Sequence, residues 1–228
     1  MRKTATPWGK IALVSATVLA AAAFAQAGDN DKDRDSGDDV VRTYDLTGFD
    51  GIDISGVYDV EVSVGQTYSI RLEGREKDLD RVKVEVDGDT LELGKNKSAK
   101  KYSKMKSIDA YITLPRLNSL DVSGVTDVEI VGIDSSEFNL DVSGVADVVL
   151  EGQCGSIDAD ISGVSDVDAS ELECESADLD MSGTSDVSIY ASSAIEADVS
   201  GVGEVDVYGQ PETVKKSVSK YTASLNIK

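Results

Sequence analysis

The 228-residue sequence contains no histidine, the residue that most often carries acid–base chemistry and binds transition metals near neutral pH. Serine–histidine and cysteine–histidine triads are therefore excluded, as are histidine-ligated zinc and iron sites. The only tryptophan, Trp8, lies in a leader that we expect to be removed, so no tryptophan remains to stack on a sugar ring. These absences favour a scaffold or a binding surface over an enzyme.

Positive charge is also scarce. The chain has 22 Lys and Arg against 43 Asp and Glu, and three of the cations (Arg2, Lys3 and Lys10) lie in the leader, which contains no acid. The remaining 19 cations and 43 acids give the mature chain a formal charge of −24. Binding to nucleic acid depends on neutralising phosphates, so this balance argues against a nucleic-acid partner.

Residues 1–27 are typical of a secretory signal peptide. A basic start is followed by an apolar run at 11–24 and by the cleavage motif AQA at 25–27, which predicts cleavage after Ala27. An uncleaved N-terminal anchor is the alternative. No second apolar stretch follows, so we expect a periplasmic or secreted protein with no transmembrane span in its mature chain.

Residues 28–39 (GDNDKDRDSGDD) contain no apolar side chain. Such a segment cannot bury enough surface to offset the entropy of ordering, so it is predicted to be a disordered acidic linker. The remaining residues, 40–228, are long enough for one domain with a hydrophobic core.

An internal repeat dominates the rest of the sequence. The octet DVSGVTDV at 121–128 recurs as DVSGVADV, DISGVSDV, DMSGTSDV and DVSGVGEV, at 141–148, 160–167, 180–187 and 198–205, and an earlier copy, DISGVYDV, lies at 53–60. From Gly124 the repeat glycines follow at steps of 20, 19, 20 and 18 residues. A degenerate copy without glycine at 218–220 is expected to form an atypical last coil.

Apolar and polar residues alternate on both sides of each glycine, as in strands with one buried face. Stacking the copies predicts three apolar columns, which are Val122, Val142, Ile161, Met181 and Val199; Val128, Val148, Val167, Val187 and Val205; and Leu120, Leu140, Ala159, Leu179 and Ala197. A single copy cannot bury these residues alone, whereas stacked copies share a core. We therefore predict an all-β fold, a single-stranded parallel β-helix (β-solenoid), expected to be right-handed, with coils of roughly 20 residues. Antiparallel hairpins of a sandwich are the alternative, but they do not require near-identical octets at a near-constant step.

Residues 61–112 interrupt the repeat with an irregular, strand-rich segment. Strands are predicted at 60–64, 68–72, 82–86 and 90–94, a hairpin turn at 87–89 and a helical turn at 76–81. Two interpretations remain open: three irregular coils, or an insertion that caps the solenoid.

These motifs resemble a known family. The stretch from Phe49 to Gly65 (FDGIDISGVYDVEVSVG), LPRL at 114–117 and the SGxxDV units are similar in order and spacing to the head GIN domain family, described as putative auto-transporter adhesins. The resemblance covers roughly residues 44–228 and implies a parallel β-helical fold in an exported bacterial protein. The repeats here read SGVxD where a GSGD-like turn is common in the family.

The repeats also predict two acidic columns, Asp121, Asp141, Asp160, Asp180 and Asp198; and Asp127, Asp147, Asp166, Asp186 and Glu204. Residues 117–214 contain 23 acids and no Lys or Arg, so the charges in these columns are not balanced locally. Solvation, bonding of Asp to turn N–H groups, or bound cations could relieve the repulsion. Calcium prefers several oxygen ligands, but the calcium β-roll has a nine-residue period and a double glycine that are missing here. A salty habitat would also explain the acidity.

Three further features are candidates for function. Cys154 and Cys174 each lie nine residues before a repeat glycine, so they should stack on adjacent coils, where a disulfide or a pair of buried thiols is expected. Residues 95–106 hold six lysines and could be a solvated loop, fold back on the acidic coils, or bind an anionic glycan or lipid head group. Tyr190 and Tyr208 could contact a partner.

Together these features predict a non-catalytic, exported cell-envelope or adhesin-like solenoid that binds an extended or surface partner, either an envelope protein or a glycan. No catalytic, cofactor or metal residue is assigned. The first alternative is a calcium-stabilised structural solenoid. The second is a polysaccharide-processing enzyme, which the interchangeable, repeat-periodic acids disfavour because an active site needs two carboxyl groups in different environments.

Overall fold

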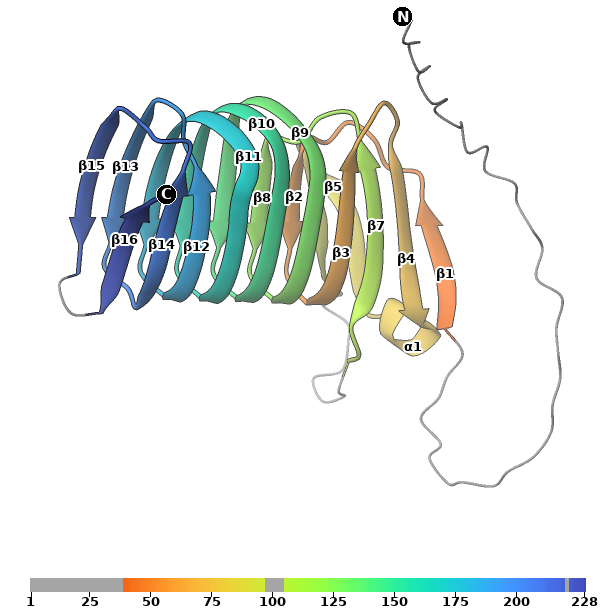
Figure 1. The fold of residues 1–228 in the computed structure, drawn as a ribbon. Helices are drawn as coiled ribbons and strands as arrows, with labels where there is room; N and C mark the ends of the chain where they lie inside the picture. Colours follow the sequence, from red (N-terminus) through yellow and green to blue (C-terminus); the bar gives the residue numbers. More distant parts are fainter. Residues whose placement is uncertain (1–38, 97–104, 220–221) are drawn as a thin grey trace, which may run out of the picture. The chain divides into compact units, whose positions relative to one another are not determined.

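The repeated octets form the coils of a parallel β-solenoid, as the sequence predicts (Figure 1). The structure is a computed structural model that describes residues 39–96, 105–219 and 222–228. The predicted signal peptide, its cleavage site and nearly all of the predicted linker lie outside the described residues. Asp39, the first described residue, begins strand β1 (Asp39–Tyr44).

The strands lie on two faces that meet at the Ser-Gly corner of each octet. The β8 face carries β2 (Gly51–Ile54), β8 (Ser119–Val122), β13 (Ala194–Val199) and β15 (Thr213–Val218). The β12 face carries β3 (Val57–Val64), β12 (Thr184–Tyr190), β14 (Gly203–Tyr208) and β16 (Ala223–Ile227). Three long strands run from the β12 face around an arc to the β8 face, namely β9 (Val125–Val142), β10 (Val145–Ile161) and β11 (Val164–Met181).

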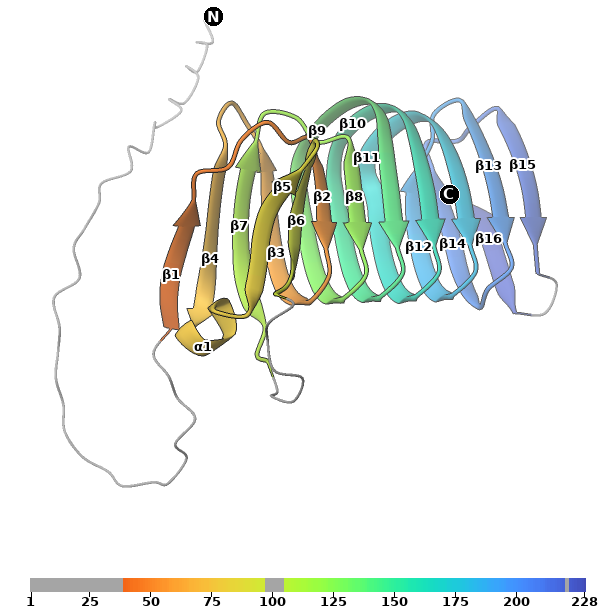
Figure 2. The same ribbon diagram turned by 180° about the vertical axis from the view of Figure 1, so that it is seen from behind.

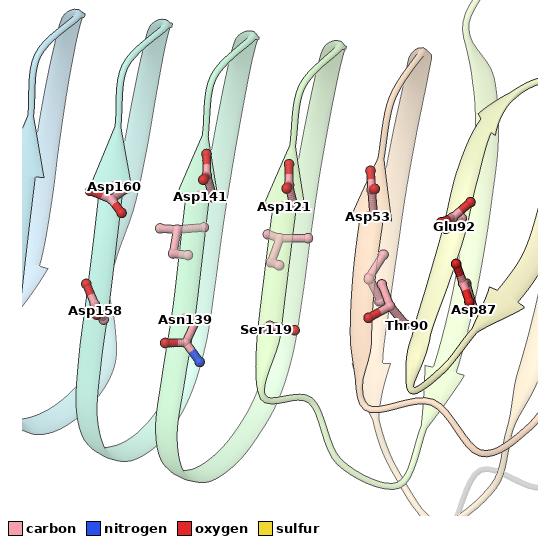
Figure 3. A pocket seen from close by; sticks show the side chains of 13 residues that line it. Asp53, Asp87, Thr90, Glu92, Ser119, Asp121, Asn139, Asp141, Asp158 and Asp160 are labelled. Carbon is pink, nitrogen blue, oxygen red and sulfur yellow. The ribbon is translucent and has the colours of Figure 1, made fainter.

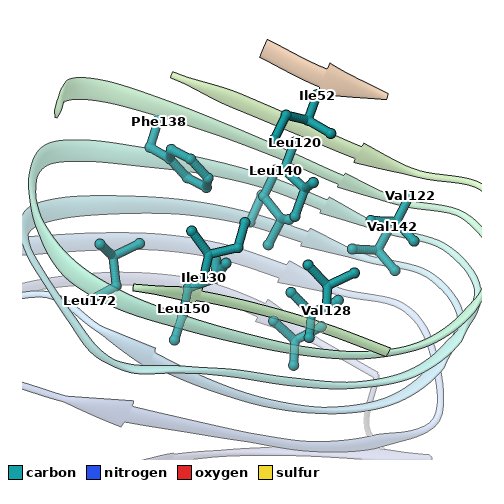
Figure 4. Close-up of a cluster of buried hydrophobic side chains, with 14 of the residues drawn as sticks. Ile52, Leu120, Val122, Val128, Ile130, Phe138, Leu140, Val142, Leu150 and Leu172 are labelled. Atoms are coloured by element: carbon teal, nitrogen blue, oxygen red, sulfur yellow. The ribbon is translucent and has the colours of Figure 1, made fainter. Parts of the chain in front are cut away.

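The predicted apolar columns stack in register inside the solenoid (Figure 4). Val122 pairs with Val142, which pairs with Ile161, and the column continues through Met181 to Val199. The columns that begin at Val128 and Leu120 continue through the predicted residues in the same way. All the predicted column residues are buried, so the alternation of apolar and polar residues is sufficient to explain the shared core.

The order of the coils differs from the order of the chain at the N-terminal end. The rung formed by β2 and β3 appears first in the sequence, yet β2 lies between β6 (Thr90–Lys95) and β8, and β3 lies between β7 (Ile108–Leu114) and β9 (Figure 2). The chain therefore completes β2–β3, builds an outer rung from β6 and β7, and crosses to β8 through residues 115–118. As a result Gly56 stacks on Gly124, and the N–H of Val125 donates to the carbonyl of Gly56 at 2.8 Å.

The segment at 61–112 is an insertion that caps the solenoid and adds one rung, so the interpretation as three irregular coils is wrong. Strand β4 (Ser69–Arg75) pairs antiparallel with β7 and with β1, and β5 (Val82–Asp87) pairs antiparallel with β6. The predicted strands, the short helix α1 (Glu76–Leu79) and the hairpin turn are confirmed, and Gly88 supplies the positive φ of 63° that the turn requires. In the cap the Arg75 Nε donates to the Asp78 carboxylate at 2.6 Å, and both side chains are buried.

The C-terminal end is built from β15 and β16, and among the described strands β15 pairs only with β13 and β16 only with β14. Val218 pairs with Val199, and the Ser219 N–H donates to the Val199 carbonyl at 2.8 Å, which confirms the degenerate last copy as far as it is described. Within the described ranges, no helix has the length and apolar composition needed to cross a membrane.

Candidate functional site

The first acidic column runs along the β8 face. Asp121 pairs in register with Asp141, and the column continues through Asp160 and Asp180 to Asp198, as predicted, with Asp53 added at its N-terminal end. Figure 3 shows the carboxyl groups of four successive coils pointing to the same side of the β8 face. A partner on this face would therefore meet the same carboxylate on each coil.

A second row of polar side chains lies beside this column on the β8 face. It begins at Asn139 and continues through Asp158, Asp178 and Glu196. The row ends at Lys215, whose Nζ lies 3.0 Å from the Glu196 carboxylate. The last coil thus provides the cation that the preceding coils lack.

Burial, together with the stacking of like charges, raises the pKa of carboxyl groups on the β8 face. Partial burial and then the neighbouring carboxylates of Asp53 and Asp141 raise the pKa of Asp121. Burial, followed by the charges of Asp158 and Glu196, raises the pKa of Asp178. In both groups partial burial disfavours the ionised form most, and the like charges of the neighbouring carboxylates add to this effect.

The hairpin of β5 and β6 closes the N-terminal end of the β8 face. Asp87, Thr90 and Glu92 from this hairpin, together with the acids of the first coils, line a solvent-open trough of about 530 Å³ (Figure 3). Burial and then the charge of Glu92 raise the pKa of Asp53, while Lys83 acts in the opposite direction. In the part of the chain that the structure describes, no three acidic or cysteine side chains are grouped so that they could hold a metal ion.

The second acidic column runs along the β12 face. Asp127, Asp147, Asp166 and Asp186 stack in register, and Asp59 extends the column on the N-terminal side. Glu204 continues it, because its backbone N–H donates to the Asp186 carboxylate at 2.9 Å. Among the described hydrogen bonds this is the only one from a backbone N–H to a member of either predicted column. The donor lies in strand β14, so none of the described hydrogen bonds runs from a turn N–H to a carboxylate of the columns.

A groove follows the Ser-Gly corner between the two faces, and we call it the corner groove. It has a volume of about 1040 Å³ and is lined by the corner residues of successive coils, namely Ser55, Gly56, Ser123–Val125, Ser143–Val145, Ser162–Val164, Ser182–Thr184, Ser200–Val202 and Thr222. None of these lining residues is charged. The residue after each glycine forms an exposed ladder, in which Val125, Val145, Val164 and Val202 are 55%, 53%, 56% and 49% exposed.

Glycine is required at the base of the corner groove because successive coils approach closely there. A Cβ on Gly144 would lie 2.1 Å from the carbonyl oxygen of Gly124, and a Cβ on Gly163 would lie 1.9 Å from that of Gly144. The flanking residues carry the bonds between coils. Ser143 N–H donates to the Val122 carbonyl, and Val145 N–H donates to the Gly124 carbonyl, each at 2.9 Å.

The corner groove was not predicted from the sequence, although a signal for it is present. The residue after each glycine has the same alternation phase as the aspartate two positions later, so its side chain must point outward. A valine follows the glycine in five of the six octets, with threonine at position 184, and this departs from the polar pattern of the two faces.

The cysteines are joined by a disulfide between adjacent coils. Cys154 pairs in register with Cys174, their Cα atoms are 4.4 Å apart, and both side chains are buried in the arc between the two faces. The structure therefore confirms the disulfide and not the alternative of two free thiols.

Two further features predicted from the sequence are the tyrosines Tyr190 and Tyr208 and the lysine-rich segment at 95–106. Tyr190 and Tyr208 stack in register on the β12 face and are half-buried. Most of the lysine-rich segment at 95–106 lies outside the described residues.

Comparison with known proteins identifies relatives of this architecture. A family model described as "Putative auto-transporter adhesin, head GIN domain" matches residues 48–211. No curated protein matches the sequence.

Two solved structures share the fold. A crystal structure of a putative adhesin from Bacteroides fragilis NCTC 9343 is similar with a TM-score of 0.67 and 24% identity, over 84% of this chain and 97% of that chain. A putative adhesin from Parabacteroides distasonis ATCC 8503 is similar with a TM-score of 0.54 and 15% identity, over 84% of this chain and 94% of that chain. At these identities the likeness concerns the fold alone.

Proposed function

Because the chain belongs to the head GIN domain family, we propose that it is an exported, adhesin-like solenoid that binds an extended partner without catalysing a reaction. The proposed location is the periplasm or the cell exterior, which agrees with the secretory leader predicted at residues 1–27. The proposed partner is a cell-envelope protein or glycan.

The observation that carries this proposal is the in-register repetition of outward side chains on both faces. Asp121, Asp141 and Asp160 present the same group at successive coils, which lie roughly 4.8 Å apart. A partner with a repeating structure could then form many equivalent weak contacts, and their sum provides avidity without a deep pocket.

Binding can be tested with the purified mature chain and an envelope fraction from the bacterium that exports it. We expect saturable retention of the chain on the fraction and a loss of retention as ionic strength rises, since the exposed charges are screened by salt. A glycan array and mass spectrometry of the retained material would identify the partner. Absence of saturable retention and of any array signal would reject the proposal.

A calcium-stabilised solenoid is the second candidate, and the in-register stacking of Asp53, Asp121 and Asp141 favours it, because a divalent cation would reduce the repulsion between stacked carboxylates. Thermal unfolding with calcium and with a chelator separates the candidates. An unchanged midpoint would remove the calcium hypothesis.

An enzyme that processes polysaccharides is the third candidate. The column carboxylates recur in similar settings on successive coils, whereas glycoside hydrolysis needs one protonated and one ionised carboxyl group. Turnover of acidic polysaccharides by the purified chain would overturn the non-catalytic proposal.

A further inference from the structure

The ladder along the corner groove is apolar although it faces solvent. Val125, Val145, Val164 and Val202 are each about half exposed, and Thr184 lies between Val164 and Val202 in the order of the coils. These side chains add little to the core because the alternation of the strands directs them outward. An exposed, mostly apolar strip along a groove is typical of a surface that contacts another molecule.

The charges beside the corner groove restrict what could occupy it. Each repeat glycine is preceded three residues earlier by a member of the β8-face column and followed three residues later by a member of the β12-face column. The uncharged groove is therefore bordered on both sides by carboxylates, and no Lys or Arg occurs between residues 117 and 214. A second copy of the chain would place like columns against each other, so the complementary occupant has an apolar centre and cationic edges.

The spacing of the ladder favours a helical occupant. Successive ladder residues lie about 4.8 Å apart, the separation of neighbouring strands. Side chains on one face of an α-helix recur about every 5.4 Å, whereas those on one face of an extended strand recur about every 6.7 Å. From Val125 to Val202 the ladder spans four steps, about 19 Å, which corresponds to roughly 13 helical residues.

From these observations we infer that the corner groove binds a basic amphipathic helix, whose apolar stripe packs on the valine ladder and whose Lys or Arg side chains pair with the two acidic columns. This inference rests on the proposed binding function and names the partner class for it. The ladder supplies the apolar contact that helix-in-groove recognition requires, and the columns supply its orientation.

The test uses three synthetic 18-residue peptides: one of Leu, Ala and Lys with an apolar stripe, a scrambled peptide of the same composition, and a striped peptide with Glu in place of Lys. Binding to the mature chain is measured by fluorescence anisotropy, and peptide helicity by circular dichroism. We expect the striped basic peptide to bind at least about tenfold more tightly than the other two and to gain helicity. Equal binding of the striped and scrambled basic peptides would overturn the inference, because charge alone would then explain the association.

Variants locate the binding surface. The double variant Val145→Ser/Val164→Ser removes the centre of the ladder, and Val41→Ser/Val149→Ser is a matched control with exposed valines outside the groove lining. We expect the first to lose about tenfold in affinity for the striped basic peptide and the control to bind as the parent chain does. Unchanged affinity in the ladder variant, with both variants melting like the parent, would reject the corner groove as the site.

The same ladder variant separates this inference from the proposed function. If the parent chain and the ladder variant are retained equally on the envelope fraction, the proposed function stands and the corner groove is not its site. If the parent chain is not retained at all, the proposed function fails, whatever the peptides show. Sedimentation of the parent chain as a dimer that the ladder variant abolishes would identify a second copy as the occupant and overturn the inference.

Discussion

Replacing Gly144 by alanine should strongly destabilise the solenoid. The new Cβ would lie 2.1 Å from the Gly124 carbonyl oxygen and 2.9 Å from its nitrogen, so the two coils must separate by about 1 Å to restore ordinary contact. That movement lengthens two backbone hydrogen bonds of 2.9 Å, one from the Ser143 N–H to the Val122 carbonyl and one from the Val145 N–H to the Gly124 carbonyl.

The expected cost follows from these contacts. Two weakened hydrogen bonds contribute about 2 kcal/mol. Overpacking against backbone that cannot rotate away adds about 1–3 kcal/mol. The free energy of unfolding should therefore fall by about 3–5 kcal/mol, which lowers the melting temperature of a domain of this size by about 10 °C.

Urea unfolding followed by circular dichroism measures this change, with Ser143→Ala as the matched control. The Ser143 side chain is exposed at the same corner, so its removal should change the free energy of unfolding by no more than about 0.5 kcal/mol. Coincident unfolding curves for Gly144→Ala and Ser143→Ala would refute the close-packing explanation of the glycine.

Three other changes test separate parts of the structure. Replacing Cys154 and Cys174 together by serine should lower the free energy of unfolding by about 2–4 kcal/mol, because the bridge closes a loop with a sequence separation of 20; equal urea midpoints for the variant and the parent chain would contradict this. Because the pKa of Asp121 is raised in the folded chain, that state holds the proton more tightly than the unfolded state, so stability should rise as pH falls from 7 through the folded-state pKa and level off below the unfolded value of about 3.9. Urea unfolding at pH 7 and at pH 4.5 measures this gain in the free energy of unfolding, and Asp121→Asn should make the gain smaller. An identical gain in the variant would show that Asp121 does not contribute to the pH dependence. Asp78→Ala removes the buried carboxylate that pairs with the Arg75 guanidinium and should cost about 3–5 kcal/mol in thermal unfolding, whereas a loss below about 1 kcal/mol would show that the pair is not needed.

The coils could be predicted from the sequence because each octet carries its own alternation and its own glycine. Position within the octet fixes which residues stack, so the columns that begin at Val122 and Asp121 follow directly from the spacing. Cys154 and Cys174 share the same offset from their glycines, which is why their proximity was also predictable.

The arrangement of the N-terminal coils could not be predicted in the same way. The octet at 53–60 identifies a coil but not its neighbours, and β7 contains no octet although it alternates regularly from Ile108 to Leu114. Only the pairing of β3 with both β7 and β9 reveals that this rung lies between two segments of later sequence. Long-range pairing of this kind depends on tertiary contacts that local patterns do not encode.

The corner groove could not be predicted from composition, because valine is usually a core residue and the outward valines of the octets resemble the buried ones. Composition counts Val145 and Val164 as core-forming, and only their phase relative to Asp147 and Asp166 shows that they face solvent. The exposed fraction of each valine side chain depends on the path of the folded backbone, so only the structure shows how exposed the ladder is.

The placement of β2 and β3 between later strands gives the solenoid mechanical polarity. A force applied at the C-terminus can peel β16 and β15 away one coil at a time, since each is held along a single edge. A force applied at the N-terminus detaches β1 first and then meets a rung clamped along both edges, by β6 and β7 on one side and by β8 and β9 on the other. Because both rows of bonds must shear together, we expect unravelling from the N-terminal end to require more force than unravelling from the C-terminal end.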